Sequence, residues 1–241
     1  MFDIYDIHTH ILPKLDDGAK SLEESIKLLE FEIENKVKGV ILTPHYRKNM
    51  FEASIQNRER SWQALNQEVK KRKLPIKLYM GCEFHSKRDM VELLDKGVPF
   101  TLNKTKNVLV EFSSEDNFSY VREQIFKLRS GGYKPIIAHI ERYPAFKGKL
   151  NLVEELIDLG AKIQITGGAV LGDYGFFTKR TCHQLLKNHL VHFVASDLHH
   201  LSNEGIELLK CAKYISKKYG EEYAREIFET NPKEIIGEEK R

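Results

Sequence analysis

Short apolar segments of this 241-residue chain end, one after another, in a histidine or an acidic residue. In sequence order, the residues at these positions are His8, His10, Asp17, His45, Glu83, Glu111, His139, Asp197 and His199. Parallel strands that close into a barrel bring their C-terminal ends to one mouth, so side chains from distant parts of the chain can meet there. The nine positions therefore predict a barrel-like sheet with a metal centre of several ions at its mouth.

The apolar segments have the composition of buried parallel strands. They are rich in Val, Ile and Leu and cover residues 2–8, 39–44, 76–82, 107–111, 134–139, 161–166 and 191–196. Amphipathic stretches at residues 22–35, 54–71, 117–129, 152–158 and 177–188 lie between them and predict helices. Ser21 and Glu24 match a capping box at the start of the first helix.

This alternation predicts βα units and an α/β fold with parallel strands. Seven units favour a distorted or incomplete (β/α)7 TIM-like barrel, with the metal site at the C-terminal ends of the strands. An open doubly wound sheet is the alternative fold, although it would gather its ligands at one crevice instead of at nearly every strand.

The C-terminal part of the chain predicts two closing helices, at residues 204–218 and 221–230. The second is expected to end near Asn231-Pro232, and the charged residues 238–241 are expected to fray. Since no linker, repeat or low-complexity block interrupts the sequence, we expect a single domain over residues 1–241.

Composition places the chain among ordinary globular proteins, with 41% hydrophobic and 30% charged residues. Its net charge of +3 is small and its cations are spread widely, which argues against a nucleic-acid partner. No segment is apolar enough to insert in a membrane, and the acidic start of the chain does not fit a signal peptide. Cys82, Cys182 and Cys211 cannot all pair and lack ligand spacing, so we expect a cytoplasmic protein.

The candidate ligands are imidazoles and carboxylates without thiolates, a donor set that suits Mn²⁺, Fe²⁺ or Zn²⁺. His8 and His10 stand two residues apart where the first strand ends, a spacing that lets both rings reach one ion. A carboxylate that ends an apolar run, such as Glu83, requires a cation, and a salt bridge to Lys or Arg is the alternative to a metal.

Other roles stay open for several of these positions. His45 and His139 are also compatible with hydrogen-bonded core histidines, and Asp17 precedes Gly18 as in a turn. The remaining histidines lack a strand-end position and are expected at the surface or in packing: His85, His183, His189, His192 and His200. Among them, His200 is close enough to the last Asp-x-His motif to support it from outside.

Seven motifs give the chain a family resemblance. They are Asp6-Ile-His-Thr-His-Ile-Leu-Pro, Asp16-Asp-Gly-Ala-Lys-Ser, Thr43-Pro-His, Gly81-Cys-Glu, Ala138-His-Ile-Glu-Arg-Tyr, Gln164-Ile-Thr-Gly and Phe193-Val-Ala-Ser-Asp-Leu-His. Together they resemble the PHP (polymerase and histidinol phosphatase) superfamily. More narrowly, the chain resembles the metal-dependent protein-tyrosine phosphatases of bacterial capsule and exopolysaccharide operons, over residues 8 to 236.

The resemblance implies a distorted (β/α)7 barrel that holds three divalent metal ions, most often manganese, with iron or zinc as alternatives. The implied ligands are His8, His10, Glu83 and Asp197 for one ion, Glu83, Glu111 and His139 for a second, and Asp17, His45 and His199 for the third. The implied substrate is the phosphotyrosine tail of an autophosphorylating bacterial tyrosine kinase that controls polysaccharide assembly.

The resemblance also implies that Arg142 binds phosphate, and a guanidinium fork suits phosphate oxygens. The second arginine that some relatives carry beyond the last Asp-x-His motif is absent from residues 200–205, and Arg47 and Lys48 are candidates to replace it. The predicted catalytic residues are Arg142, Asp197 and His199, and the predicted substrate-binding residues are Arg142, Arg47 and Tyr46. Phe51 and Tyr174 are further aromatic residues expected in the mouth loops.

In the expected reaction, a hydroxide that bridges two ions attacks phosphorus in line, while the metals and Arg142 neutralise the equatorial oxygens. A phenolate, whose parent acid has a pKa of about 10, departs more readily than an alkoxide, so phosphotyrosine asks little of a general acid.

Three rival interpretations stay open. Cys82 and Arg88 have the spacing of the cysteine-dependent tyrosine phosphatases, although the loop between them has no glycine and opens with an acid. A small-molecule phosphatase of the histidinol phosphate type, or a nuclease of the same superfamily, would use the same centre. A metal-stabilised regulatory module would bind its partner without catalysis. The sequence does not predict the oligomeric state.

Overall fold

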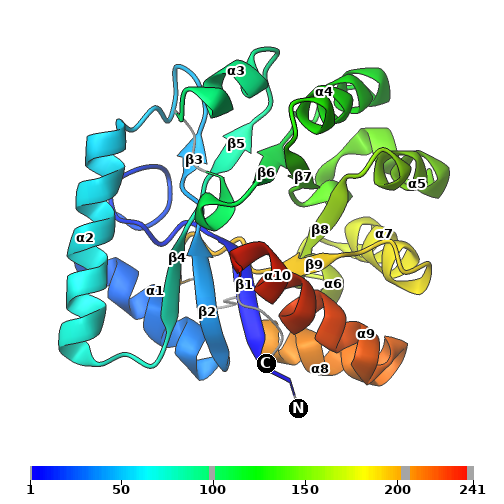
Figure 1. Cartoon of the computed structure of the whole chain (residues 1–241). Helices are drawn as coiled ribbons and strands as arrows, with labels where there is room; N and C mark the ends of the chain where they lie inside the picture. Colours follow the sequence, from blue (N-terminus) through cyan, green and yellow to red (C-terminus); the bar gives the residue numbers. More distant parts are fainter. Residues whose placement is uncertain (1, 98–100, 202–206, 238–241) are drawn as a thin grey trace.

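The computed structural model of the chain describes residues 2–97, 101–201 and 207–237, and its strands form a curled parallel sheet (Figure 1). One group of parallel strands runs in the order β1 (Ile4–Thr9), β2 (Val37–Leu42) and β4 (Lys77–Met80). A second group runs in the order β3 (His45–Tyr46), β5 (Glu83–His85), β6 (Asn107–Glu111), β7 (Lys134–Ile137), β8 (Lys162–Thr166) and β9 (Phe193–Ala195). All neighbours are parallel, as the βα alternation predicts.

Two of the seven predicted strands are broken in the middle. Pro44 lacks an N–H and separates β2 from β3, and Gly81 separates β4 from β5. Hydrogen bonds continue across both breaks, because Gly81 N donates to Leu42 O at 2.9 Å and Glu83 N donates to Pro44 O at 3.3 Å. A Cβ on Gly81 would lie only 2.8 Å from the Ile41 side chain, so this crossing requires glycine. The nine short strands therefore follow seven paths around the barrel.

The first and last paths meet and close the sheet at its C-terminal end. Thr9 forms a parallel bridge with Leu198, and the Asp197 N–H donates to His8 O at 3.0 Å. Nearer the N-terminal end, the buried Asp6 carboxylate accepts the N–H groups of Ser196 and His8, each at 3.1 Å. A side chain thus takes the place of a backbone ladder along this seam.

Helices cover the outside of the sheet (Figure 1). Their bounds are α1 Leu22–Glu34, α2 Ile55–Arg72, α3 Met90–Asp95, α4 Phe118–Ser130, α5 Leu150–Asp158, α6 Gly167–Leu171, α7 Phe176–Lys187, α8 Leu208–Tyr219, α9 Glu221–Arg225 and α10 Asn231–Ile236. Short 3₁₀ turns lie at η1 Leu102–Lys104, η2 Ile140–Arg142 and η3 Pro144–Phe146. At the start of α1 the Ser21 hydroxyl accepts from Glu24 N, while the Glu24 carboxylate accepts from Lys20 N rather than Ser21 N.

Both faces of most strands are buried, which explains their nearly continuous apolar runs, whereas β4 is half-buried. One apolar cluster includes Ile7, Ile41, Leu109, Ile136 and Phe193 from the strands, and Ile235 and Ile236 of α10 join it. The other face packs against the surrounding helices. Helix α10 lies across the barrel near β1 (Figure 1), and its Ile236 carbonyl accepts a hydrogen bond from Asn103 at 2.7 Å.

The C-terminal helices depart from the sequence prediction. The helix expected over residues 221–230 ends as an α-helix at Arg225, continues as one π turn, η4 (Glu226–Thr230), and is followed by α10. Pro232 does not stop the chain because it lies in the first turn of α10, where its missing N–H is not needed. The helix expected from residue 204 begins at Leu208; residues 204–206 and the expected frayed tail, 238–241, lie outside the described residues.

Helices α3 and α6 were not expected. Within residues 2–97, 101–201 and 207–237, no helix is long and apolar enough to cross a bilayer.

Candidate metal centre

Four candidate ligand atoms lie close together at the barrel mouth, and those of His8, His10 and Asp197 form one compact group. The Nε2 atoms of His8 and His10 lie 3.1 Å apart. Each also lies 3.3 Å from Glu83 Oε2, and Asp197 Oδ1 is 3.2 Å from the His8 ring nitrogen and 3.4 Å from that of His10. Ligands about 2.1 Å from one ion in a tetrahedron lie about 3.4 Å from one another, and the group of His8, His10 and Asp197 has this spacing, with Glu83 Oε2 beside its two rings.

The backbone at the strand ends directs these side chains inward. His8 and His10 stand two residues apart at the end of β1. His139 and Asp197 both have left-handed backbones, with φ of 32° and 58°. Such conformations are uncommon for residues with a Cβ and are concentrated at functional sites. The chain therefore holds two candidate ligands in conformations that the surrounding barrel must stabilise.

Glu83 lies at the middle of the candidate centre. Its Oε1 is 2.8 Å from His139 Nε2, and its Oε2 is 2.8 Å from His45 Nδ1. Neither His45 Nδ1 nor Glu83 Oε2 has an aligned hydrogen bond among the described residues, although both atoms are buried. Two buried polar atoms this close, without an aligned hydrogen bond, are suited to bind the same cation from one side, and the second oxygen would allow Glu83 to contact another ion.

Two further groups of ligand atoms adjoin the first. His45, Glu83 and Glu111 form one group, and His10, Asp17, His45 and His199 form the other, with the ligand atoms of each group within 4.8 Å of one another. Asp17 Oδ1 lies 3.6 Å from His45 Nε2 and from His199 Nε2, and its side chain is half exposed. Asp17 is thus beside the two histidines with which the resemblance groups it.

Most of the histidines are oriented from outside the centre through Nδ1. The partners of Nδ1 are the Gln164 side-chain oxygen for His8 at 3.2 Å, Asp16 Oδ2 for His10 at 2.7 Å, the Tyr143 hydroxyl for His139 at 3.2 Å and the Asp197 carbonyl for His199 at 2.9 Å. This pattern leaves Nε2 facing the centre in all four rings, as expected for imidazoles that bind metal through Nε2. The donor set and its outer contacts fit a divalent metal centre.

Electrostatics lead to the same conclusion. Burial disfavours the charged form of His8, but the neighbouring Glu83 and Asp197 carboxylates raise its pKa. Burial also disfavours the ionised form of Glu83, yet the surrounding histidines hold the pKa of Glu83 well below its usual range. The carboxylates therefore stay ionised and attract positive charge to their shared centre. Divalent ions supply that charge without requiring protonated rings.

Arg142 lies at the edge of this centre, at the end of η2. Its Nη2 donates to Asp197 Oδ2 at 2.7 Å, so its ion pair is with a candidate metal ligand instead of with the adjacent Glu141. Burial alone would lower the pKa of Arg142. The carboxylates of Asp197 and Glu141 outweigh this effect and raise the pKa above its usual range, so the guanidinium stays charged. The Glu141 carboxylate instead accepts from the Thr166 N–H and hydroxyl. Arg142 is thus a fixed cation beside the centre.

The prediction for Tyr46 needs correction, and one rival interpretation is excluded. Tyr46 is 7% exposed and packs against Phe84 in the hydrophobic core, because neighbouring residues of a strand point to opposite faces and His45 takes the inner one. This side chain does not reach the mouth, so a contact with substrate is not supported. Cys82 is 1% exposed in the same core while Arg88 is exposed, which excludes the cysteine-dependent rival.

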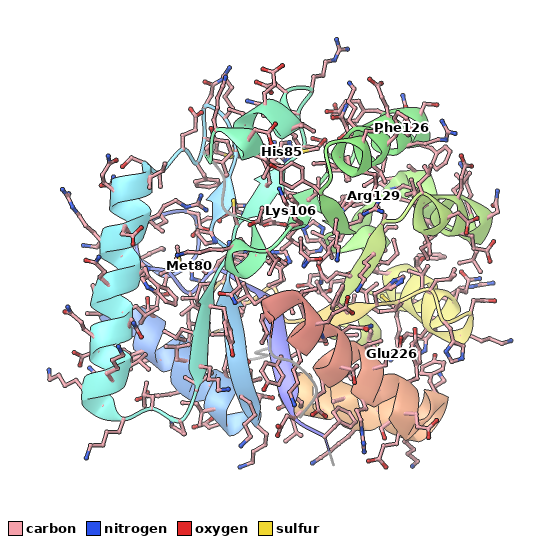
Figure 2. The ribbon with its side chains drawn as sticks, viewed as in Figure 1. Met80, His85, Lys106, Phe126, Arg129 and Glu226 are labelled. Atoms are coloured by element: carbon pink, nitrogen blue, oxygen red, sulfur yellow. The ribbon has the colours of Figure 1, made fainter. Side chains whose placement is uncertain are left out.

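Of two histidines expected at the surface or in packing, His85 differs from this expectation, whereas His200 lies at the surface with a side chain 45% exposed. His85 is not a simple surface residue, because its Nδ1 donates to Glu111 Oε2 at 2.9 Å and its Nε2 is 3.3 Å from the Ser113 hydroxyl. His85 comes from β5, beside β6, which carries Glu111 (Figure 2). His200 pairs with Glu24 at 3.2 Å, and no hydrogen bond joins it to a candidate ligand among the described residues.

The loop after β3 forms another side of the mouth. Arg47 and Phe51 pair through two backbone hydrogen bonds in a tight hairpin. Arg47 N donates to Phe51 O at 2.9 Å, and Phe51 N donates to Arg47 O at 2.8 Å. The Phe51 ring stacks on the His45 ring with centroids 5.4 Å apart. Phe51 therefore lies at the centre as expected, and Arg47 is at the base of the hairpin that carries it.

The outer partners of the histidines are the residues that sequence reasoning missed. Asp16 accepts from His10 Nδ1 and from His45 N at 2.9 Å, so it joins two candidate ligands. Gln164 accepts from His139 N at 2.9 Å as well as contacting His8. Both residues belong to motifs quoted for the family resemblance, which is the signal that marks them.

Comparisons with known proteins agree with this structure. The family described as "Capsular polysaccharide synthesis, CpsB/CapC" matches residues 4–237. The tyrosine-protein phosphatase CpsB of Streptococcus agalactiae is 35% identical over 96% of this chain and 97% of its own length. The tyrosine-protein phosphatase YwqE of Bacillus subtilis is 30% identical over 90% and 85%, respectively.

Solved structures show the same likeness. A structure from the work on YwqE of Bacillus subtilis and CpsB of Streptococcus pneumoniae, described as metal-dependent tyrosine phosphatases, superposes with a TM-score of 0.91 at 28% identity and covers 98% of this chain and 96% of that one. Histidinol phosphate phosphatase from Lactococcus lactis shares the fold, with a TM-score of 0.64 at 14% identity over 91% of this chain and 95% of that one. The barrel, its ligand-lined mouth and these matches together show that the chain belongs to the CpsB/CapC family.

Proposed function

We propose that this protein is a metal-dependent protein-tyrosine phosphatase that hydrolyses phosphotyrosine in a bacterial tyrosine kinase regulating capsule or exopolysaccharide synthesis. The observation that carries the proposal is the cluster of His8, His10 and Asp197, with Glu83 beside both rings and a charged Arg142 bonded to Asp197. The relatives named as tyrosine-protein phosphatases match nearly the whole chain, which supports the same activity here. The proposed domain spans residues 1–241.

The nine candidate ligands are proposed to hold three Mn²⁺ ions. The three groupings of ligand atoms support this number, and the absence of thiolates from them suits Mn²⁺, Fe²⁺ or Zn²⁺. When bound, the ions would supply Lewis-acid charge to the phosphoryl oxygens and acidify a water molecule as nucleophile. Glu83, whose two oxygens face different histidines, would bridge neighbouring ions.

The protein side chains position the substrate and compensate its charge. Arg142 Nη2 is bonded to Asp197 at 2.7 Å and to the Tyr174 hydroxyl at 3.5 Å, so Nε and Nη1 are the groups that would bind phosphoryl oxygens from a fixed direction. His199 is held by the Asp197 carbonyl, and its burial lowers the pKa of His199. Arg142, Asp197 and His199 are the proposed catalytic residues.

Phe51 and Tyr174 are suited to flank an aromatic phosphoester. Phe51 stacks on His45. The Arg142 guanidinium carbon lies over the Tyr174 ring, 5.2 Å from the centroid of that ring. A phenolate with a parent pKa of about 10 leaves without strong protonation, so the site does not need a dedicated acid for this substrate. Arg47, beside Phe51, is the proposed second contact to phosphate. We place the protein in the cytoplasm, a reducing compartment that fits its three cysteines without a disulfide.

The test is hydrolysis of a phosphotyrosine peptide by the purified protein, after chelation and again with Mn²⁺ restored. Cys82→Ser and His139→Ala are assayed in parallel. The proposal expects activity that is lost on chelation, returns with metal, survives Cys82→Ser and is lost in His139→Ala. Chelator-resistant activity, or faster turnover of histidinol phosphate than of the peptide, would contradict it. A protein inactive on any phosphoester but still able to bind the kinase would be a regulatory module.

A further inference from the structure

An exposed aromatic surface adjoins the metal centre between helices α6 and α7. Tyr174, Phe176 and Phe177 lie here, and their side chains are 46%, 71% and 64% exposed. Large apolar rings that stay in water, next to one another and beside a catalytic site, are typical of a binding surface. We call these three residues the aromatic strip.

The strip is connected to the candidate site by cations and ring contacts. The Arg142 guanidinium lies over the Tyr174 ring, and its Nη2 is 3.5 Å from the Tyr174 hydroxyl. Further out, Lys147 Nζ lies 4.7 Å from the centroid of the Phe177 ring. Phe176 meets Phe177 edge to face at 5.7 Å. Arg142 with Tyr174, and Lys147 with Phe177 and Phe176, thus form two cation–ring contacts carried by the same short segment, residues 174–177.

The strip is held in place by the backbone. Gly172 and Gly175, with φ of 114° and 87°, turn the chain between α6 and α7, a conformation that favours glycine. Lys179 Nζ donates to Leu171 O at 2.8 Å and fixes the end of α6. Phe176 and Phe177 belong to the first turn of α7, a helix of 12 residues. The rings are thus presented on a turn anchored at both ends.

We propose that the aromatic strip binds the part of the substrate polypeptide that flanks the phosphotyrosine, a proposal that rests on the proposed phosphatase function. The ligand is an extended acidic segment with an aromatic or aliphatic residue close to the phosphotyrosine. Its apolar side chain packs on Phe176 and Phe177, and its acidic groups approach Lys147. The contact of Tyr174 with Arg142, the cation of the candidate catalytic site, favours this occupant over a lipid surface or a second copy of the chain, which would not need to reach that site.

The strip gives the enzyme a way to select proteins over small phosphoesters. A free aryl phosphate can fill the space beside Arg142 but has no atoms that reach Phe176. A polypeptide engages both regions at once. Selectivity for macromolecular substrates would then come from KM for the peptide, without a change in the chemistry at the centre.

The experiment compares the Mn²⁺-loaded wild type with a Phe176→Ala/Phe177→Ala double variant on two substrates. One is a phosphotyrosine peptide with acidic and apolar flanking residues, and the other is p-nitrophenyl phosphate. Phe126→Ala is the matched control, because Phe126 is a similarly exposed phenylalanine, 59%, on α4 (Figure 2). We expect the double variant to raise KM for the peptide about tenfold and to leave p-nitrophenyl phosphate hydrolysis unchanged. Phe126→Ala should leave both substrates unchanged.

A second peptide, in which the flanking apolar residues are replaced by alanine, completes a double-mutant cycle. The wild type and the double variant should hydrolyse this peptide with the same KM. Equal KM values for the first peptide would overturn the strip and leave the proposed function standing. A double variant with unchanged peptide kinetics that no longer self-associates, or no longer binds anionic vesicles, would assign the strip to those partners instead. A wild type active only on p-nitrophenyl phosphate would overturn both proposals.

Discussion

Arg142 donates a hydrogen bond of 2.7 Å to Asp197, so the cation at the mouth is fixed by a residue that also belongs to the candidate metal shell. The contact joins the end of η2 to the end of β9 and sets the direction of the guanidinium. Any shift of Asp197 on metal binding would move Arg142 as well.

The first prediction concerns this pair. Arg142→Lys keeps the positive charge but loses the planar guanidinium. A lysine ammonium cannot hold Asp197 and a phosphoryl group at the same time in the way that the guanidinium fork can. We expect kcat/KM for a phosphotyrosine peptide to fall about 100-fold in steady-state assays, with the metal content of the purified protein unchanged. Activity of Arg142→Lys within twofold of wild type would show that the fork does not bind phosphate.

The second prediction concerns His85, which donates to Glu111 at 2.9 Å. Outer contacts of this kind orient a metal ligand, and their loss weakens metal binding by roughly 10- to 100-fold. His85→Phe should therefore weaken Mn²⁺ binding by about tenfold or more in a competition titration with a chromogenic chelator. His85→Asn retains an N–H near the position of Nδ1 and should bind Mn²⁺ more tightly than the Phe variant. Equal affinities in all three proteins would mean that Glu111 needs no such support.

The third prediction concerns Gly18, where the loop that carries Asp16 and Asp17 meets β1. A Cβ at this position would lie 2.0 Å from the His10 carbonyl oxygen, which the Ala19 N–H binds at 3.0 Å. Because the clash is with backbone, Gly18→Ala must displace the loop, and we expect it to lower the free energy of unfolding by about 2 kcal/mol or more.

Urea denaturation in the presence of chelator measures this loss without the contribution of bound metal. Gly148→Ala is the control, since Gly148 has positive φ but open space around its Cβ position, so only its backbone preference, about 1 kcal/mol, is lost. A Gly18→Ala protein as stable as wild type would show that the loop moves freely at this point.

The fourth prediction concerns pH and His192. Burial, with the nearby charge of Lys162, lowers the pKa of His192 to about 4, and its Nδ1 accepts the Ile163 N–H. In the unfolded state, His192 has an ordinary histidine pKa of about 6.5, so between pH 6.5 and pH 4 the unfolded state binds more protons than the folded state. The contribution of His192 to the free energy of unfolding is therefore fully present above pH 6.5 and is lost as the pH falls toward 4.

His192→Asn keeps an acceptor for Ile163 and removes the titrating ring. The stability advantage of wild type over this variant should therefore shrink by about 2 kcal/mol between pH 7 and pH 4, measured by urea denaturation in chelator. A constant difference across this range would show that His192 carries no proton-linked stability.

The sequence predicted the parallel βα architecture because buried parallel strands have an unusual signature, continuous apolar runs separated by helices. It also placed the nine candidate ligands near one another, since strand ends of a barrel converge. Tyr46 was misjudged although alternation along a strand puts it opposite His45, and the same alternation sets His85 on the face of Glu83. Both positions could have been assigned by that rule.

Other features depend on contacts between distant parts of the chain. Gln164 reaches both His8 and His139, and no local pattern specifies which histidine a glutamine will orient. Pro232 ended the predicted helix, whereas the π turn before it shifts the proline into a new first turn. The extra residue of the π turn places Pro232 in a first helical turn, where proline is tolerated. Helix propensities do not predict a π turn, so the sequence could not show this position.

The seam between β1 and β9 also determines when the protein can become active. His8 and His10 emerge early in synthesis, but the shell around them needs Asp197, whose N–H bonds back to His8 O at 3.0 Å. A fragment that ends before Asp197 lacks one side of the seam. A nascent chain therefore carries histidines without a completed site until its last strand has been made, and metal acquisition reports that the barrel has closed.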